Sequence, residues 1–139
     1  MSRAGLTAAR RRRFARMADV LVAEGHGMPA ASTVGVAEEL LDRCLAAVPS
    51  LREPLLNLLD NAPDEGLDAF VRGLASARPE GFAVLSTTVV GAYYLSPEVR
   101  ERIGYPGQQP RPFSVADEPD YLDLLERVYE RHPGYRACP

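Results

Sequence analysis

The stretch from Gly81 to Pro97 carries no charged residue, although charged residues make up 25% of this 139-residue chain. Apolar and small side chains occupy nearly every side of its helical wheel: Phe82, Leu85, Val89 and Tyr93 on one face, and Val84, Thr88 and Gly91 on the other. A helix that is apolar all round is surrounded by other helices or by a partner. β-Branched residues such as Thr87 and Val90 favour a strand instead. Because the run is long for a strand and contains no turn signal, we predict a central helix over Gly81–Leu95.

Apolar residues at helical spacing predict further helices along most of the chain. In chain order they run from Thr7 to about Glu24, from Ser32 or Thr33 to Val48, from Ser50 onward, from Asp64 to Arg78, from Ser96 to Ile103, and over Asp117–Arg131. The last one is amphipathic and is expected to turn these residues inward: Tyr121, Leu122, Leu125, Val128 and Tyr129. The sequence therefore predicts an all-α fold, a single compact domain over residues 1–139 with about six to seven helices, and mobile tails over 1–6 and 134–139.

Three of these helix starts carry residues that cap a helix. Thr7 is a predicted N-cap for the first helix. Ser50 and Glu53 have the spacing of a capping box, in which each side chain satisfies a free amide near the other. Ser96–Glu98 places a serine cap, a proline in the first helical position and an acid in the first turn. We therefore expect the helices to begin close to these residues.

Residue types used in catalysis and metal binding occur without the spacing that their chemistry requires. The histidines His26 and His132 and the cysteines Cys44 and Cys138 show no zinc-ligand spacing. No nucleophile elbow and no phosphate-binding glycine loop is present. Cys44 lies in an apolar helical pattern and is expected to be a small buried hydrophobe; its pairing with Cys138 is left open. We expect no catalytic, cofactor-binding or metal-binding residue in this chain.

Arginines are concentrated near the start of the sequence. Six of the 16 basic residues lie between Arg3 and Arg16, in a chain whose net charge is −3. They form either the solvated face of the first helix or a docking strip for an acidic partner. Nucleic acid is the third alternative, and we do not expect it, because neither a recognition-helix fold nor stacking aromatics accompany the arginines.

The run Arg10–Arg13 also invites a twin-arginine export signal. Such a signal needs an uninterrupted apolar stretch behind the arginines, and Arg16 and Asp19 interrupt it here. The uncharged stretch 81–97 is shorter than a membrane span requires. We therefore expect a cytoplasmic protein without a membrane span.

The segment from Phe82 to Pro112 reads FAVLSTTVVGAYYLSPEVRERIGYPGQQPRP. The small residues Thr88 and Gly91 leave space for another helix to approach closely, and residues 104–107 are expected to form a rigid aromatic turn. The segment resembles the family called gluconate 2-dehydrogenase subunit 3, in which F-x-x-L…T-x-x-G-[YF]-[YF]-x-[SD]-P precedes an IGYPG-type turn. Residues 18–32 are similar to the start of that family, where a helix ends in a loop before P-x-A-S. Together the matches span most of residues 18–112.

The resemblance implies a non-catalytic partner subunit. Small subunits of this family accompany a large flavin-dependent dehydrogenase of the glucose–methanol–choline type, which carries the FAD and the substrate site. They help it to fold, to load flavin or to reach its compartment. The family often lends its partner a twin-arginine signal, and this chain departs from that pattern. The expected role is therefore stabilisation or assembly of a cytoplasmic complex, with no cofactor in this chain.

The expected partner interface combines small, aromatic and proline residues around the aromatic turn. Its predicted members are Thr88, Gly91, Tyr93, Tyr94, Gly104, Tyr105, Pro106, Gly107, Pro110, Pro112 and Phe113. Tyrosines supply apolar area with a polar tip, and prolines reduce the ordering entropy that opposes binding. In the alternative, Tyr105 and Pro106 only pack their loop onto the chain's own core.

Two other classes of function compete with the accessory subunit. A freestanding helical regulator would use the arginine-rich N-terminus on nucleic acid or on an acidic partner, and its binding to nucleic acid would fall steeply with salt. A small enzyme would need a pocket built around His26 or Tyr105, and the purified chain would turn over a substrate alone.

Overall fold

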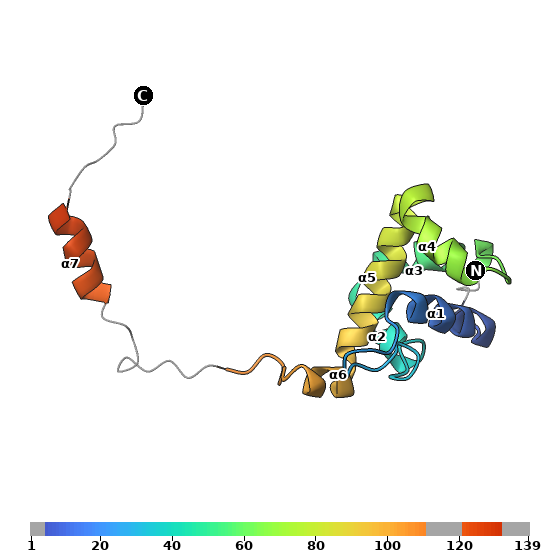
Figure 1. Ribbon diagram of the computed structural model, residues 1–139, viewed down its shortest axis with the longest axis horizontal. Coiled ribbons are helices and arrows are strands. Elements are labelled where there is room, and N and C mark those ends of the chain that lie inside the picture. Colours follow the sequence, from blue (N-terminus) through green and yellow to red (C-terminus); the bar gives the residue numbers. More distant parts are fainter. Residues whose placement is uncertain (1–4, 111–120, 132–139) are drawn as a thin grey trace, which may run out of the picture. The chain divides into compact units, whose positions relative to one another are not determined.

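The computed structural model describes residues 5–110 and 121–131, and all regular structure in these residues is helical (Figure 1). Gly25 and Met28 form an isolated bridge within a turn. The predicted all-α fold is confirmed. Contacts divide the chain into two units, residues 1–107 and 108–139, which are described separately. The single domain over 1–139 stays a prediction.

The described residues contain seven α-helices. In the first unit they are α1 Ala8–Leu21, α2 Glu39–Ala47, α3 Arg52–Asn61, α4 Leu67–Ala77, α5 Pro79–Leu95 and α6 Pro97–Arg102. A short 3₁₀ turn, Pro49–Leu51, precedes α3. The second unit contains α7, Tyr121–Arg131.

Helix α5 is the element around which the first unit packs. It contacts α1, α2, α3, α4 and α6. Its buried residues, Leu85, Thr88, Val89, Ala92 and Tyr93, lie on one side of the helix. The predicted central helix is confirmed, but it is not covered all round, because Ala83, Thr87, Val90 and Tyr94 are exposed at helical spacing.

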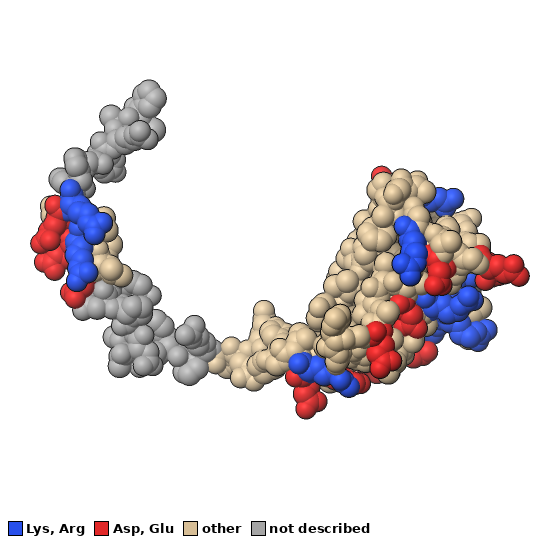
Figure 2. All heavy atoms as spheres, in the orientation of Figure 1, with Lys and Arg blue, Asp and Glu red and all other residues tan. Residues whose placement is uncertain are grey.

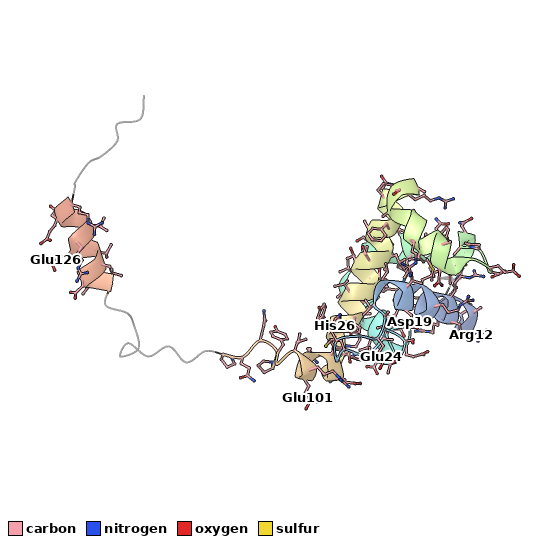
Figure 3. The ribbon with its side chains drawn as sticks, viewed as in Figure 1. Arg12, Asp19, Glu24, His26, Glu101 and Glu126 are labelled. Atoms are coloured by element: carbon pink, nitrogen blue, oxygen red, sulfur yellow. The ribbon has the colours of Figure 1, made fainter. Side chains whose placement is uncertain are left out.

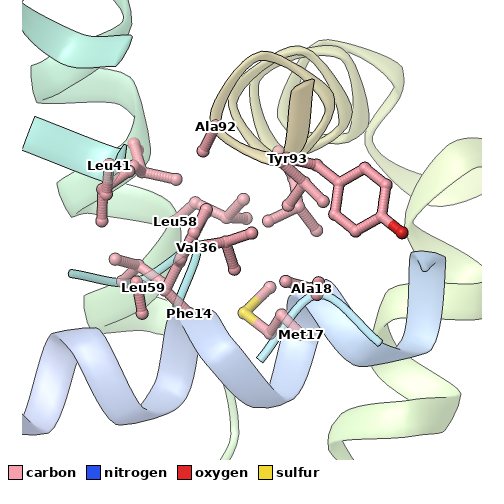
Figure 4. Packing of buried hydrophobic residues seen from close by; sticks show 14 of the residues in the cluster. Phe14, Met17, Ala18, Val36, Leu41, Leu58, Leu59, Ala92 and Tyr93 are labelled. Atoms are coloured by element: carbon pink, nitrogen blue, oxygen red, sulfur yellow. The ribbon is translucent and has the colours of Figure 1, made fainter. Parts of the chain in front are cut away.

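The core of the first unit forms where α1, α2, α3 and α4 meet the buried side of α5. Figure 4 shows Phe14 and Met17 of α1 directed toward Val36, Leu59 and the side chains of α5. Cys44 of α2 is a buried free thiol in the same cluster, as the sequence predicts. Burial raises the pKa of this thiol, because removal from water disfavours the thiolate.

Two of the predicted helix caps are present. The Thr7 hydroxyl oxygen accepts a hydrogen bond from the Arg10 amide at 3.3 Å, and the Ser96 hydroxyl oxygen accepts one from the Val99 amide at 3.4 Å. Each satisfies one of the amides that a helix start leaves without a partner.

Three predictions about helix ends are wrong. The first helix ends at Leu21, not near Glu24. The second starts at Glu39, because residues 31–38 form turns in which Gly35 has φ 72°. The Ser50 capping box does not form, since the Leu51 amide donates to the Val48 carbonyl in a 3₁₀ turn and α3 begins without a side-chain cap.

Helix α7 is strongly amphipathic, but its apolar residues are exposed. Leu122, Leu125, Val128 and Tyr129 are 61–76% exposed. Because the two units are described separately, the inward orientation of this face stays a prediction. The predicted helix start at Asp117 lies outside the described residues.

The α2–α5 contact generates the first prediction. A Cβ atom at Gly91 would lie 2.9 Å from Cys44 Sγ, a distance that real contacts do not reach, whereas a Cβ at Gly73 of α4 would meet open space. Gly73→Ala should therefore stabilise the chain by about 0.5–1 kcal/mol through helix propensity. Gly91→Ala should lower the free energy of unfolding. The double variant Gly91→Ala/Cys44→Ala should be more stable, by about 1 kcal/mol or more, than the sum of the two single effects predicts. Urea unfolding of the four variants and the wild type measures this; additive effects would contradict the close contact.

Candidate docking surface

The aromatic turn after α6 is a rigid C-terminal cap. The Tyr105 amide donates to the Arg100 carbonyl at 2.8 Å, and the Gly104 amide donates to the Glu101 carbonyl at 3.0 Å. Gly104 has φ 68°, in the left-handed region that glycine tolerates best. These are the paired hydrogen bonds of a Schellman motif, with Gly104 just past the helix and Pro106 preventing its continuation. The sequence Ile-Gly-Tyr-Pro therefore fixes Tyr105 at the end of α6.

A surface depression lies between α6 and this turn. Its volume is about 520 Å³, and its lining residues are Pro97, Arg100, Glu101, Gly104, Tyr105 and Pro106. Tyr105 and Ile103 are both 48% exposed. Tyr105 thus presents about half of its surface to solvent and buries the other half.

The exposed end of α5 adds a second tyrosine. Tyr94 is 50% exposed, and its ring meets that of Tyr93 edge-on, with centroids 5.7 Å apart. In Figure 2 the edge of the first unit along which α5 runs is tan except for red at its upper end, and the only charged residue of α5 is Glu80 at its start. We call the exposed residues Tyr94, Ile103, Tyr105 and Pro106 the knuckle surface.

Three of the predicted interface residues lie inside the first unit and not on its surface. Thr88 and Tyr93 are buried, and Gly91 faces Cys44 of α2. The Tyr93 hydroxyl donates to the Pro29 carbonyl at 2.7 Å, and burial, followed by the neighbouring Tyr94, raises the pKa of Tyr93. These residues stabilise the fold, because other helices of the same unit pack against their side of α5.

The other predicted interface residues have different outcomes. Gly104 and Gly107 have positive φ angles and shape the turn through their backbone. Pro110 is exposed and belongs to the second unit. Pro112 and Phe113 lie outside the described residues. The use of the remaining surface by a partner stays a prediction.

The turn over residues 25–29 is attached to the ends of α5 and α6. Arg102 Nη1 donates to the Gly27 carbonyl at 2.7 Å, close in sequence to the Pro29 carbonyl that Tyr93 binds. His26 lies in this turn with φ 51°, and Figure 3 shows it near the α6 end of the unit. The two segments that carry the family resemblance are thus held against each other, although they are far apart in sequence.

The arginine cluster of α1 is largely used inside the first unit. Arg10 binds both carboxylate oxygens of Asp60 at 2.8 and 2.6 Å. Arg11 binds Asp42 of α2 at 2.8 Å and the Ala37 carbonyl at 2.7 Å. These pairs fasten α1 to the helices on either side of it.

Arg13 forms a third attachment. It pairs with Asp64 and donates to the Leu59 carbonyl at the end of α3. Arg12 and Arg16 are exposed, and neither forms an ion pair with a described residue. The sequence suggested either a solvated face or a docking strip for these arginines, and neither interpretation anticipates ion pairs inside the unit. The acids that pair with the arginines lie elsewhere in the sequence, outside α1.

Within residues 5–110 and 121–131, no three His, Cys, Asp or Glu side chains are grouped closely enough to hold a metal ion. No helix in the same residues combines the length and the apolar character needed to cross a membrane.

Comparisons with protein-family models, with curated proteins and with solved structures give no match to this chain. The resemblance to gluconate 2-dehydrogenase subunit 3 therefore rests on the quoted sequence motifs.

The arginine attachments generate a prediction about acid stability. The hydrogen bonds from Arg10 hold the pKa of Asp60 below its ordinary value. A lowered folded-state pKa contributes stability above the unfolded value of about 3.9 and loses it as pH falls through the folded-state value. Urea midpoints from neutral pH to about pH 3 should therefore fall less in Asp60→Asn than in the wild type. Glu24→Gln, which removes an exposed carboxylate, is the control; equal pH dependence in Asp60→Asn and the wild type would refute the contribution.

Proposed function

We propose that this chain is a non-catalytic small subunit that binds and stabilises a large FAD-dependent sugar or alcohol oxidoreductase of the glucose–methanol–choline type. The partner carries the flavin and the substrate site, and this chain carries neither. The complex is cytoplasmic, and the knuckle surface is where the large subunit docks.

The observation that carries the proposal is the rigid, half-exposed knuckle surface. Tyr105 and Pro106 line the depression, and Tyr94 and Ile103 are further exposed apolar residues at the ends of α5 and α6. Exposed apolar surface of this kind is typical of interaction sites when it is contiguous. Tyrosines are enriched among the residues that dominate binding energy. The Schellman turn holds Tyr105 in place before a partner arrives, so little ordering entropy opposes docking.

The freestanding regulator is the alternative function, and it depends on the arginines of α1. Arg10, Arg11 and Arg13 are paired with carboxylates of the same unit, which leaves fewer free cations for nucleic acid or for an acidic partner. Each phosphate contact with nucleic acid requires such a cation. This pairing favours the accessory subunit over the regulator.

The contact between the two resemblance-bearing segments gives further support. Residues 27–29 accept hydrogen bonds from Arg102 and Tyr93, which belong to the late motif. The late motif thus holds the turn of the early motif in place, which is a structural reason for the two motifs to occur together.

The docking proposal predicts the effect of truncating Tyr105. Because removal of a central aromatic side chain from an interface typically costs about 2 kcal/mol, Tyr105→Ala should weaken binding of the co-purified large subunit roughly thirty-fold. The variant should keep the helical circular-dichroism spectrum and urea midpoint of the wild type. Val48→Ala, which trims another exposed apolar residue, is the control and should bind normally. If Tyr105→Ala unfolds, Tyr105 belongs to the core; if it binds normally, the knuckle surface is not the interface.

A second prediction concerns the flavin. The chain purified with its partner from the native source should show flavin absorbance, whereas the isolated chain should be colourless and without oxidoreductase activity. Residues 25–30 have the glycine spacing of a dinucleotide fingerprint, but they lie in a turn after helix α1 and not between a strand and a helix, the setting in which that spacing binds a pyrophosphate. An isolated, partner-free chain that retains flavin would overturn the proposed division of roles.

A further inference from the structure

Arg100 lines the depression beside Tyr105 and has no carboxylate within ion-pair distance among the described residues. Its Nε is buried and has no hydrogen-bond acceptor. A buried donor without an acceptor carries a free-energy penalty, larger when the group is charged, so native structures contain few of them. The Arg100 residue lines the depression although its Nε atom does not face solvent, so an acceptor supplied from outside reaches Nε only when the side chain turns.

Two other arginines of the same unit show what such an acceptor looks like. Arg10 donates from Nε and Nη2 to the two carboxylate oxygens of Asp60, at 2.8 and 2.6 Å. Arg102 donates from Nε and Nη2 to Glu98, at 3.2 and 2.8 Å. In both, the Nε edge of the guanidinium binds a carboxylate; Arg10 binds the two oxygens of Asp60 in the fork geometry that makes such pairs strong, and the two donors of Arg102 share the single oxygen Oε1 of Glu98.

We infer that Arg100 anchors an acidic side chain of the docking protein, and that apolar neighbours of that acid rest on Tyr105 and Pro106. This inference rests on the proposed function and names the chemistry of its docking surface. Because Nε is buried in the free chain, docking has to turn the Arg100 side chain so that its Nε edge faces the depression, where one carboxylate then satisfies both Nε and a terminal nitrogen. The donor that the free chain leaves unsatisfied then contributes to binding.

The surroundings of Arg100 favour a singly charged carboxylate on a protein segment over a phosphate. Glu101 lines the same depression, so a doubly charged phosphate would meet one cation and one anion. Tyr105 and Pro106 offer apolar contact, which a free inorganic anion cannot use. A singly charged acid flanked by apolar residues pairs with Arg100, uses the apolar contact and meets less repulsion from Glu101 than a doubly charged phosphate does.

A blocked tripeptide, acetyl-Leu-Asp-Leu-amide, tests the inference without the large subunit. Its binding to the full chain is followed by NMR through the Arg100 Nε–H resonance and the Tyr105 ring signals. The acetyl-Leu-Asn-Leu-amide peptide keeps the shape and removes the charge, and inorganic phosphate is the third probe. The aspartate peptide should shift both sets of signals and bind about tenfold more tightly than the asparagine peptide, as expected for about 1.4 kcal/mol from one charge-assisted pair.

Matched variants separate the anchor from general charge effects. Arg100→Gln should reduce aspartate-peptide binding to the asparagine level, and Arg100→Lys, which keeps the charge and loses the fork, should lie between. Arg12→Gln removes an exposed arginine from α1 and should change nothing; Figure 3 shows Arg12 at the opposite end of the first unit from Glu101. Urea midpoints of the variants check that each remains folded.

Several outcomes would overturn the inference: no peptide binding at Arg100, equal binding of the two peptides, tighter binding of phosphate than of the aspartate peptide, or retained binding in a folded Arg100→Gln. The proposed function is tested apart from this. If the peptide test fails while a flavin-containing complex still forms and Tyr105→Ala releases it, only the anchor is wrong. If the peptide binds as expected but the native chain has no flavoprotein partner, the proposed function is wrong.

Discussion

The packing of α5 against α2 is the contact on which the first unit depends. Gly91 lets the two helices approach until a single added methyl group would collide with Cys44 Sγ. At this separation Leu85, Val89 and Ala92 reach the core that α1, α3 and α4 complete. The absence of charge from residues 81–97 allows this depth of burial, because an ionised side chain there would lose its hydration without a partner.

In the proposed complex, the same helix determines where the large subunit can dock. Its buried side is fully used by the unit, and its exposed side continues toward α6 and the Schellman turn at Gly104. Tyr93 serves the fold, because its hydroxyl binds the Pro29 carbonyl inside the unit. Tyr94 is half exposed and is available to a partner. A surface built in this way is rigid, apolar and adjacent to one unpaired cation, Arg100, which suits recognition of a complementary protein.

Local signals in the sequence predicted much of this arrangement. The helix over 81–95, the Thr7 and Ser96 caps and the turn at Gly104 depend on neighbouring residues, and all four are present. The Ser50 capping box failed because Pro49 began a 3₁₀ turn that used the nearby amides first. The pairing of Arg10 with Asp60 and the hydrogen bond from Tyr93 to the Pro29 carbonyl could not be predicted, since both join residues about fifty or more positions apart.

Amide hydrogen exchange of the chain, alone and in complex with its co-purified large subunit, tests the central claim most directly. The account predicts that amides of residues 94–107 exchange more slowly in the complex, while those of the exposed face of α4 are unchanged. Protection confined to α1 around Arg12 and Arg16, with none over 94–107, would contradict it and would place the docking site on the arginine face.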